Sequence, residues 1–308
     1  MILEYYGEDE KLSNDFYQNK AKVLIEALPY IKDYFNETVV IKLGGAIMED
    51  DAGLIEVLND IVLMKFVGIK VILIHGGGKQ ITKLMNERKI EVEFCEGLRI
   101  TTKETIDIVK MVLLGEINPK IVSFLNKHGE IAIGISGNDA NFIDCKRKAY
   151  LKDGKNIDLG FVGEIKDIDS NFLINILNND YLPVIASLGS DKNGNIYNIN
   201  ADTCACEVAS KLKAKKLILL TDVDGIKVKD ESKEKLISII SVKGCLKLIK
   251  EKVISEGMIP KARACIDALK SGVERTHILN GNYEHSILIE IFTNKGIGTM
   301  IVNDLDET

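Results

Sequence analysis

The stretch Val39-Val40-Ile41-Lys42-Leu43-Gly44-Gly45 guides the interpretation of the whole chain. Its mostly β-branched run, followed by paired glycines, predicts a buried strand that ends in a tight turn before a helix. Lys42 is unusual in this run because burying an unpaired ammonium group is costly. Either Lys42 reaches solvent at the end of the strand, or an anion makes its position favourable. Phosphate-binding turns and a partner carboxylate elsewhere in the chain would favour the second interpretation.

The composition predicts a soluble globular protein. The 308 residues are enough for two compact lobes, and 46% are hydrophobic and 28% charged. The net charge of −6, without a block rich in Lys and Arg, argues against nucleic acid as a main partner. The chain contains no apolar stretch near the roughly 20 residues that span a bilayer. Its acidic beginning lacks the basic region of a signal peptide, so we expect a cytoplasmic protein without a membrane partner.

The six cysteines form no CxxC pair and no zinc-type cluster with the four histidines. Cys204 and Cys206 form the closest pair, but residues two apart on a helix do not face each other. We therefore expect reduced thiols, most of them buried. The six are Cys95, Cys145, Cys204, Cys206, Cys245 and Cys265.

Strands and helices are predicted to alternate along the chain, which indicates an α/β protein with a mainly parallel sheet between helix layers. In such sheets, ligands bind at the carboxyl ends of the strands. The predicted strands are 39–43, 70–75, 130–135, 182–187, 216–221, 275–279 and 299–302, with a hairpin in 142–166 and a short apolar segment at 286–292. The predicted helices are 53–67, 79–88, 103–115, 118–128, 170–180, 203–213, 242–256 and 260–271.

A further helix is predicted before the first strand, from about Asn19 to Phe35. Val23, Ala27 and Ile31 lie on one stripe of this helix, as in an amphipathic segment. Pro29 falls within the pattern and is expected to kink or break the helix. Such an appended helix either packs as a flap or serves oligomerisation.

Gly76-Gly77-Gly78 follows the predicted strand 70–75 directly. Three glycines let a backbone approach an anion closely, and the N-terminus of the next helix offers free N–H groups. Ile81 breaks the dinucleotide fingerprint, and Leu73 and Gln80 break the P-loop pattern. The alternative is a plain strand–helix turn. With Gly44-Gly45 after a second parallel strand, however, two turns can face one anion.

Polar side chains at other predicted strand and helix ends add to this picture. Arg99, in the loop Gly97–Thr101, suits a carboxylate, although it can equally be a surface arginine. Asp202 follows Asn198 and Asn200 and either caps the next helix or orients ammonium groups. The two asparagines would line a polar pocket.

Two further groups belong to the same pattern. Asp222 follows the strand 216–221 and suits a ribose or Mg²⁺, or it belongs to an ordinary turn. Lys261 starts a helix, where the dipole disfavours a cation unless an anion also binds. Two lysines, two glycine turns and an aspartate, without a candidate nucleophile, point to phosphoryl transfer, which needs charge neutralisation and positioning rather than covalent help.

These motifs, in this order, resemble the amino-acid kinase family over about residues 22–302. The resemblance implies a three-layer αβα sandwich preceded by a helix. It divides the chain into an N-terminal extension with an oligomerisation helix (1–36), an acyl-amino-acid-binding lobe (37–212) and a nucleotide-binding lobe that also holds arginine-site elements (213–308). The matching motifs are Lys42-Leu43-Gly44-Gly45, His75-Gly76-Gly77-Gly78, Gly97-Leu98-Arg99, Asn198-Ile199-Asn200-Ala201-Asp202 and Gly257-Met258-Ile259-Pro260-Lys261.

Within that family the motifs are most similar to those of enzymes that phosphorylate the γ-carboxylate of N-acetyl-L-glutamate with ATP, in arginine biosynthesis. Mg²⁺ would accompany ATP rather than be held by protein side chains. The resemblance assigns catalysis to Lys42, Asp202 and Lys261, phosphate cradling to Gly44, Gly45, Gly76 and Gly77, substrate binding to Arg99, Asn198 and Asn200, and a place in the nucleotide lobe to Asp222.

The predicted N-terminal helix is similar to the one that joins dimers into a hexamer in members inhibited by arginine. By that resemblance Tyr30, Glu290 and Gly296 would hold inhibitory L-arginine, with Glu290 as the countercharge for its guanidinium. The alternative is a core helix and an ordinary glycine turn. The assembly would be a dimer or a trimer of dimers.

Two residues depart from the family pattern. Ala46 stands where a small polar residue is usual, and Asn138 replaces the usual lysine in Ser136-Gly137-Asn138-Asp139. Two other interpretations stay open. The chain could be a family member acting on an acyl-aminoadipate, aspartate or carbamate, or a non-catalytic arginine sensor, although a sensor is expected to lack a catalytic lysine or the aspartate.

Overall fold

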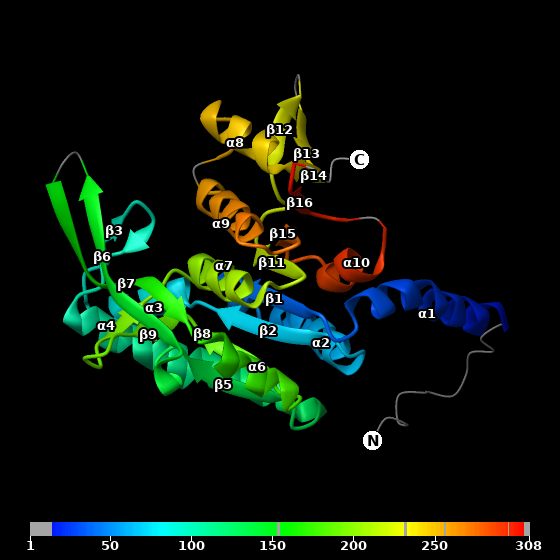
Figure 1. Cartoon of the computed structure of the whole chain (residues 1–308), viewed down its shortest axis with the longest axis horizontal. Helices are drawn as coiled ribbons and strands as arrows, with labels where there is room; N and C mark the ends of the chain where they lie inside the picture. The colour runs from blue at the N-terminus through cyan, green and yellow to red at the C-terminus, as the bar shows by residue number, and fades with distance from the viewer. Residues whose placement is uncertain (1–13, 153–154, 231–232, 256, 295, 305–308) are drawn as a thin grey trace.

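An eight-stranded sheet runs through the middle of the molecule (Figure 1). The computed structural model describes residues 14–152, 155–230, 233–255, 257–294 and 296–304. Neighbouring strands are parallel except for β15 and β16, which confirms the predicted mainly parallel sheet. In order across the sheet, the strands are β14 (Ile239–Ser241), β16 (Thr299–Val302), β15 (Arg275–Asn280), β11 (Lys216–Thr221), β1 (Thr38–Leu43), β2 (Lys70–His75), β8 (Leu182–Ala186) and β5 (Ala132–Ser136).

Helices cover both faces of this sheet, so the predicted three-layer sandwich is confirmed (Figure 1). Alternate residues of β1 enter the two cores: Val39 and Ile41 pack on one face and Val40 on the other. The first face is covered by α2 (Asp51–Phe66), α5 (Asn118–Leu125) and α10 (Ser286–Phe292). The second is covered by α6 (Ser170–Asn178), α7 (Ala201–Leu212), α8 (Val242–Lys250) and α9 (Ile259–Lys270).

Several smaller elements lie outside the eight-stranded sheet and the helices that cover it. The predicted hairpin in 142–166 is confirmed as β6 (Ile143–Lys152) and β7 (Lys155–Ile168), which close a small barrel with β9 (Leu188–Ser190) and β10 (Ile196–Asn198). The other elements are β3 (Phe94–Cys95) with β4 (Leu98–Arg99), β12 (Lys227–Asp230) with β13 (Lys233–Leu236), α3 (Gly78–Glu87), and the short turns Ile47–Glu49, Asn126–His128 and Asp139–Asn141.

Two helix breaks that the sequence suggested do not occur in the described residues. The first helix, α1 (Asn14–Tyr34), is continuous through Pro29. Ile25 and Pro29 are exposed, so water can reach the Ile25 carbonyl, which loses its usual partner to the proline. The predicted helices 103–115 and 118–128 form one helical run, because the π-helical turn Met111–Ile117 joins α4 (Lys103–Lys110) to α5. Pro119 lies in the first turn of α5, next to the wider hydrogen-bond spacing of the π-helix.

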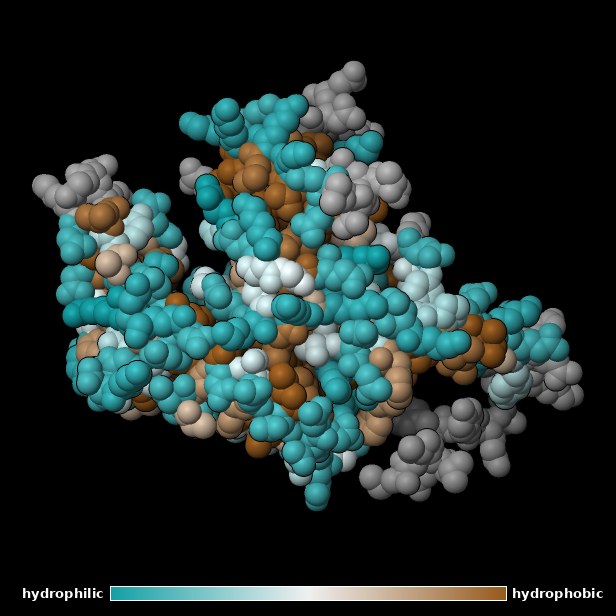
Figure 2. Space-filling view, viewed as in Figure 1, coloured by the Kyte–Doolittle hydropathy of each residue, from teal (hydrophilic) through white to brown (hydrophobic). Residues whose placement is uncertain are grey.

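α1 extends away from the body of the molecule, and its C-terminal end is the anchored part (Figure 1). Tyr34 is buried there, and Lys215 Nζ donates to the Asp33 carbonyl at 3.1 Å. The free part carries exposed hydrophobic side chains, visible as the brown cluster on this helix in Figure 2. They are Val23, Leu24, Ile25 and Leu28. Residues 1–13 of the predicted extension lie outside the described residues.

Each of the six cysteines is a free thiol, and all but Cys95 are buried, as predicted. Within the described ranges, none of the helices is long and apolar enough to cross a membrane.

Candidate active site

A cavity of about 610 Å³ opens where the carboxyl ends of β1, β2 and β11 meet β10 and the start of α7. The parallel register places Lys42 beside Ile74 on one side and Leu219 on the other, so the segments that follow all three strands emerge together. Every residue predicted for catalysis, substrate or nucleotide lines this cavity. These are Lys42, Gly44, Gly45, Gly76, Gly77, Arg99, Asn198, Asn200, Asp202, Asp222 and Lys261.

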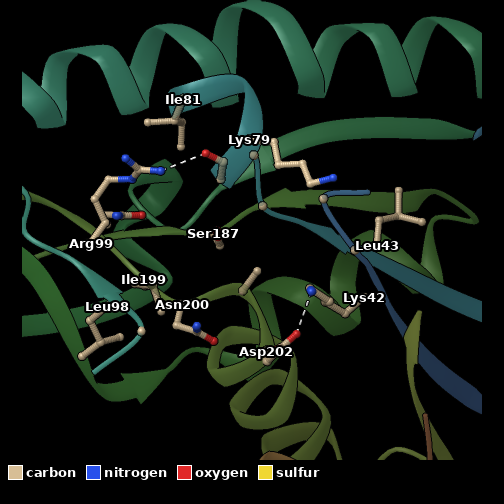
Figure 3. Close-up of a pocket in the computed structure, with 18 of the residues that line it drawn as sticks. Lys42, Leu43, Lys79, Ile81, Leu98, Arg99, Ser187, Ile199, Asn200 and Asp202 are labelled. Carbon is tan, nitrogen blue, oxygen red and sulfur yellow. Dashed lines mark hydrogen bonds and ion pairs between the residues drawn. The ribbon is translucent and has the colours of Figure 1, made fainter. Parts of the chain in front are cut away.

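Asp202 joins the two predicted lysines. Its Oδ1 lies 2.7 Å from Lys42 Nζ, and its Oδ2 lies 2.7 Å from Lys261 Nζ. Figure 3 shows the first of these pairs at the edge of the cavity. Lys42 is 7% exposed, so the interpretation that it reaches solvent is wrong. Two ammonium groups and one carboxylate leave one positive charge (2 − 1) facing the cavity.

The electrostatics of this group follow from burial and pairing. Burial by itself raises the pKa of Asp202, but Lys42 and Lys261 outweigh it and bring the pKa to about 2, so the carboxylate stays ionised. Burial lowers the pKa of Lys42, against the attraction of Asp202. Asp202 is therefore required for Lys42 to remain charged in this place.

Of the two alternatives for Asp202, capping of α7 is wrong, because Asn200 is the capping residue. Asn200 Oδ1 accepts a hydrogen bond from the Thr203 backbone N–H at 3.0 Å. With the helix end capped two residues earlier, the Asp202 carboxylate faces the lysines instead. The sequence Asn-x-Asp leaves both assignments open, since either side chain is a favourable cap.

The two glycine turns line the cavity together, as predicted. A Cβ on Gly44 would lie 2.6 Å from the Leu220 carbonyl oxygen of β11, so only glycine allows this close approach of two strand ends. A Cβ on Gly77 would lie 2.6 Å from Ile117 Cδ1. Gly45, in contrast, has open space on its Cβ side, with Lys79 Cγ at 4.0 Å. The turns thus leave room for an anion close to backbone N–H groups.

His75 supports the second turn, a role that its place in the motif His75-Gly76-Gly77-Gly78 did not reveal. It is fully buried, its Nε2 lies 3.0 Å from Asn118 Nδ2, and its Nδ1 lies 3.1 Å from the Gly76 carbonyl oxygen. Burial lowers the pKa of His75 to about 4, so the ring is neutral and accepts from Asn118 while donating to Gly76. No local sequence pattern could have predicted the contact between His75 and Asn118, because the two residues are far apart along the chain.

Arg99 is buried, so its interpretation as a surface arginine is wrong. Its Nη2 donates to the Gly78 carbonyl at 2.8 Å and to Thr82 Oγ1 at 2.6 Å. The guanidinium also lies 4.7 Å from the centre of the Phe94 ring. These contacts hold Arg99 at the end of the cavity beside Asn200, opposite Lys42 (Figure 3).

The remaining polar residues occupy the walls of the cavity. Asn198 comes from β10, and its Nδ2 donates to Thr101 Oγ1 at 3.3 Å. Asp222 follows β11 and accepts from Thr221 Oγ1 at 3.2 Å. Ala46 also lines the cavity, whereas Asn138 is not among its described lining residues and accepts from Ser136 Oγ at 2.7 Å.

The sequence profile of the amino acid kinase family matches residues 37–280. The chain belongs to this family. The kinase is 47% identical to the acetylglutamate kinase of Caldicellulosiruptor saccharolyticus, with 96% of this chain and 99% of the relative covered. It is 48% identical to the acetylglutamate kinase of Archaeoglobus fulgidus, with 91% and 98% covered. The resemblance stated from the motifs is thereby confirmed, and the chain is a phosphotransferase enzyme.

Solved structures agree with this assignment. N-acetylglutamate synthase from Neisseria gonorrhoeae, complexed with coenzyme A and N-acetyl-glutamate, superposes on the kinase with a TM-score of 0.83 at 26% identity. The match covers 92% of this chain but only 63% of the synthase. Carbamate kinase from Giardia lamblia has a TM-score of 0.61 at 17% identity, with 87% and 99% covered, and shows the shared fold.

A second group of predicted residues lies together in this kinase, away from the cavity. Tyr30, near the C-terminal end of α1, donates its hydroxyl to Asn294 Oδ1. Glu290 on α10 accepts from the Ile297 N–H at 3.3 Å, and a Cβ on Gly296 would lie 3.1 Å from Glu290 Oε2. The segment after α10 thus brings the three predicted arginine-site residues into one region.

Two buried residues complete that region and were not predicted. His277 Nδ1 lies 2.7 Å from Glu290 Oε1. Burial lowers the pKa of His277 to about 4 and that of Lys216 to about 8. For Glu290, burial is outweighed by His277 and Lys216, and the net pKa is lowered, so Glu290 is ionised. A buried carboxylate beside a neutral histidine is suited to a cationic ligand.

Proposed function

We propose that this kinase transfers the γ-phosphoryl group of ATP to the γ-carboxylate of N-acetyl-L-glutamate. A carboxylate oxygen forms a bond to the γ-phosphorus while the bond to the β-phosphate oxygen breaks, and ADP and an acyl phosphate result. The product would serve arginine biosynthesis. The observation that carries the proposal is the Lys42–Asp202–Lys261 group beside two glycine turns in one cavity. The names of the most similar relatives supply the acceptor.

Charge neutralisation explains the roles of the three charged residues. Two anions, a carboxylate and a triphosphate, must approach each other, and negative charge spreads over the transferring group. Lys42 and Lys261 would offset that charge from fixed positions, which requires no reorganisation during the reaction. Asp202 would act as a positioning residue, because it holds both ammonium groups 2.7 Å from its oxygens.

The acceptor would lie at the Arg99 end of the cavity and the nucleotide at the Asp222 end. Arg99 and Asn198 would bind the α-carboxylate of the acceptor, with Asn200 beside them, and Gly76 and Gly77 would provide N–H groups. Gly44 and Gly45 would cradle the nucleotide phosphates. We keep the proposed division into an acceptor lobe at 37–212, whose Gly44-Gly45 turn would also reach the nucleotide phosphates, and a nucleotide lobe at 213–308; both border the same cavity.

Mg²⁺ would enter with ATP. Among the described residues, no group of three His, Cys, Asp or Glu side chains gathers to hold a metal ion. Asp202 is paired with two lysines, whereas Asp222 lines the cavity with no lysine described within ion-pair distance, although its charge still acts on Lys42. This fits an ion held largely by phosphate oxygens, as Mg²⁺ commonly is in kinases. Bound there, the ion would neutralise phosphate charge.

A hydroxamate assay tests the reaction, because hydroxylamine traps acyl phosphates as they form. We expect ATP-dependent product with N-acetyl-L-glutamate. A higher rate with an acyl-aminoadipate, aspartate or carbamate would instead assign a different acceptor within the family. If the chain binds ADP but forms no product with any of these four acceptors, the result would favour the non-catalytic sensor and contradict the proposal.

We further propose that L-arginine inhibits the kinase at the region of Tyr30, Glu290 and Gly296. Support comes from the buried, ionised Glu290, the only carboxylate described in contact with His277 there. Glu290→Gln is expected to raise the arginine concentration for half-inhibition by about tenfold or more, the loss of one charge-assisted contact. The hydroxamate rate without arginine should not change.

Glu284→Gln is the matched control, since Glu284 is exposed and lies just before α10. It should leave the half-inhibiting concentration unchanged. Arginine-insensitive activity of the unaltered chain would contradict the regulatory proposal alone and leave the catalytic one intact.

α1 is proposed to join dimers into a trimer of dimers. Its exposed hydrophobic side chains are the support, since a projecting helix gains stability by covering such a patch (Figure 2). Leu24 is 71% exposed, so Leu24→Lys should not disturb the body of the protomer. We expect this variant to lower the mass of the assembly in light scattering, while Lys20→Gln on the same helix should not. An unchanged mass for Leu24→Lys would contradict this role.

A further inference from the structure

Lys79 lines the active-site cavity but has no role in the reaction as proposed above. It is the second residue of α3, directly after the Gly76-Gly77-Gly78 turn. The positive end of a helix dipole disfavours a lysine unless an anion is near. Within the described residues, Lys42 and Lys261 are the other lysines that line this cavity, and both are paired with Asp202.

The side chain of Lys79 passes over the first glycine turn. Its Cγ lies 4.0 Å from the point where a Cβ on Gly45 would stand, and this is the nearest atom to that point. Figure 3 shows the side chain extending from α3 toward Leu43 at the end of β1. The side chain of Lys79 therefore starts at one glycine turn and passes beside the other.

The partner of Lys79 is easily exchanged. Its Nζ lies 2.5 Å from Glu49 Oε2, and the two side chains are 52% and 49% exposed. Ion pairs with this exposure contribute little to stability, because water screens both charges. A phosphate group, with more negative charge and several acceptor oxygens, is a stronger partner for the same ammonium.

Exchange of the partner does not require the backbone to move. Gln80 Nε2 donates to the Met48 carbonyl at 3.3 Å, which joins α3 to the turn Ile47–Glu49 independently of the ion pair. Gln80 is partly buried, so this contact is less open to solvent than the Lys79–Glu49 pair. Only the Lys79 and Glu49 side chains need to separate.

We propose that Lys79 is a third phosphate-binding lysine, which leaves Glu49 when nucleotide enters and pairs with the phosphates beside Gly44 and Gly45. The inference rests on the proposed function in one respect, namely that ATP occupies this cavity. The proposal gives the three lysines different roles. Lys42 and Lys261 are held in place by Asp202, whereas Lys79 takes its position from the nucleotide.

Calorimetric titration with ADP in the presence of Mg²⁺ tests the inference, with Lys79→Gln compared against Lys83→Gln. Lys83 is exposed one turn further along α3 and lines no part of the cavity, so both variants lose one positive charge from the same helix. We expect Lys79→Gln to raise the Kd for ADP by about tenfold, as for loss of one charge-assisted hydrogen bond. Lys83→Gln should leave it unchanged.

Two further measurements sharpen the test. Glu49→Gln removes the competing carboxylate and is expected to lower the Kd for ADP by about twofold, which corresponds to the weak exposed ion pair. The Kd for N-acetyl-L-glutamate should be the same in all variants. An ADP affinity of Lys79→Gln equal to that of Lys83→Gln would overturn the inference, as would an equal loss of affinity for the acceptor.

Failure of this inference can be told from failure of the proposed function. If the unaltered chain forms acyl phosphate but Lys79→Gln binds ADP like the control, Lys79 is not a phosphate ligand and the function stands. Suppose instead that the unaltered chain binds ADP and that Lys79→Gln weakens this binding, but that the unaltered chain phosphorylates none of the acceptors. The inference about Lys79 then stands, and the proposed function fails.

Discussion

Replacing Lys42 with methionine is expected to lower kcat in the hydroxamate assay by about 10³-fold, the range seen when one fixed charge on a transferring phosphoryl group is lost. Lys42 Nζ is held by Asp202 Oδ1 at the wall of the cavity. Methionine matches the lysine side chain as far as Cε and fills most of the same space. The change therefore removes the charge and leaves the packing of β1 intact.

The fold should tolerate this replacement. Lys261 remains 2.7 Å from Asp202, so the carboxylate is not left uncompensated. We expect a loss of unfolding free energy well below the roughly 3–5 kcal/mol that follows when a buried charge loses its only partner. Urea unfolding measures it.

Lys216→Met is the matched control. Lys216 is 3% exposed and lies on β11, the neighbouring parallel strand, but at its amino end opposite Val39. Its removal also takes a buried ammonium out of the same sheet, yet far from the cavity. It should leave kcat without arginine unchanged. Equal activities of Lys42→Met and Lys216→Met would show that Lys42 is not part of the catalytic charge.

The pH dependence of kcat offers a second check on Lys42. Burial lowers its pKa from the ordinary value of 10.5, although Asp202 opposes this shift. Lys42 loses its proton on the alkaline side, so the decline of activity with rising pH should begin below 10.5. A full rate maintained above that value would contradict the assignment.

Replacing Asp202 with asparagine is expected to destabilise the protein as well as slow it. The change leaves two ammonium groups without their shared countercharge in a buried site. We expect a loss of roughly 3 kcal/mol in the free energy of unfolding and a fall in kcat of about 10²-fold or more, because neither lysine is held in position. Because the pKa of Asp202 is lowered from 3.8 to about 2, unaltered protein has this stabilisation in full above 3.8 and loses it progressively as the pH falls from there toward 2.

Inorganic phosphate provides a readout that simple misfolding does not mimic. With Asp202 neutralised, the two lysines form an anion site, so phosphate should raise the unfolding free energy of Asp202→Asn more than that of unaltered protein. Asp222→Asn changes a carboxylate in the same cavity and should alter stability by less than about 0.5 kcal/mol. If the two variants were equally stable, Asp202 would not be the countercharge of the lysines.

Local patterns account for the parts of the fold that were predicted correctly. The apolar run before Gly44 is buried on both faces, and β-branched residues favour the extended chain there, so the strand was recognisable without a partner. Predictions failed where the surroundings compensate for a local signal. Pro29 and Pro119 lie in helical segments because solvent and a π-helical turn accommodate the lost hydrogen bonds.

The candidate site shows the same division. Lys42, Asp202 and Lys261 were chosen by residue type at predicted strand and helix ends, but whether Asp202 caps its helix depends on how Asn200 is oriented. Residues such as His75, His277 and Lys79 carry no pattern of their own. Their contacts with Asn118, Glu290 and Glu49 join segments of the chain that local periodicity cannot relate.

The sequence by itself determined the succession of strands and glycine turns and the presence of the charged residues, because those depend on neighbours along the chain. Only the tertiary structure decided that Lys42 and Lys261 share one carboxylate, since the strand and the helices that bear the three residues meet through packing across the sheet. The ion pair with Asp202 at 2.7 Å offsets the desolvation of the buried Lys42 ammonium. No residue of the stretch 39–45 provides this carboxylate.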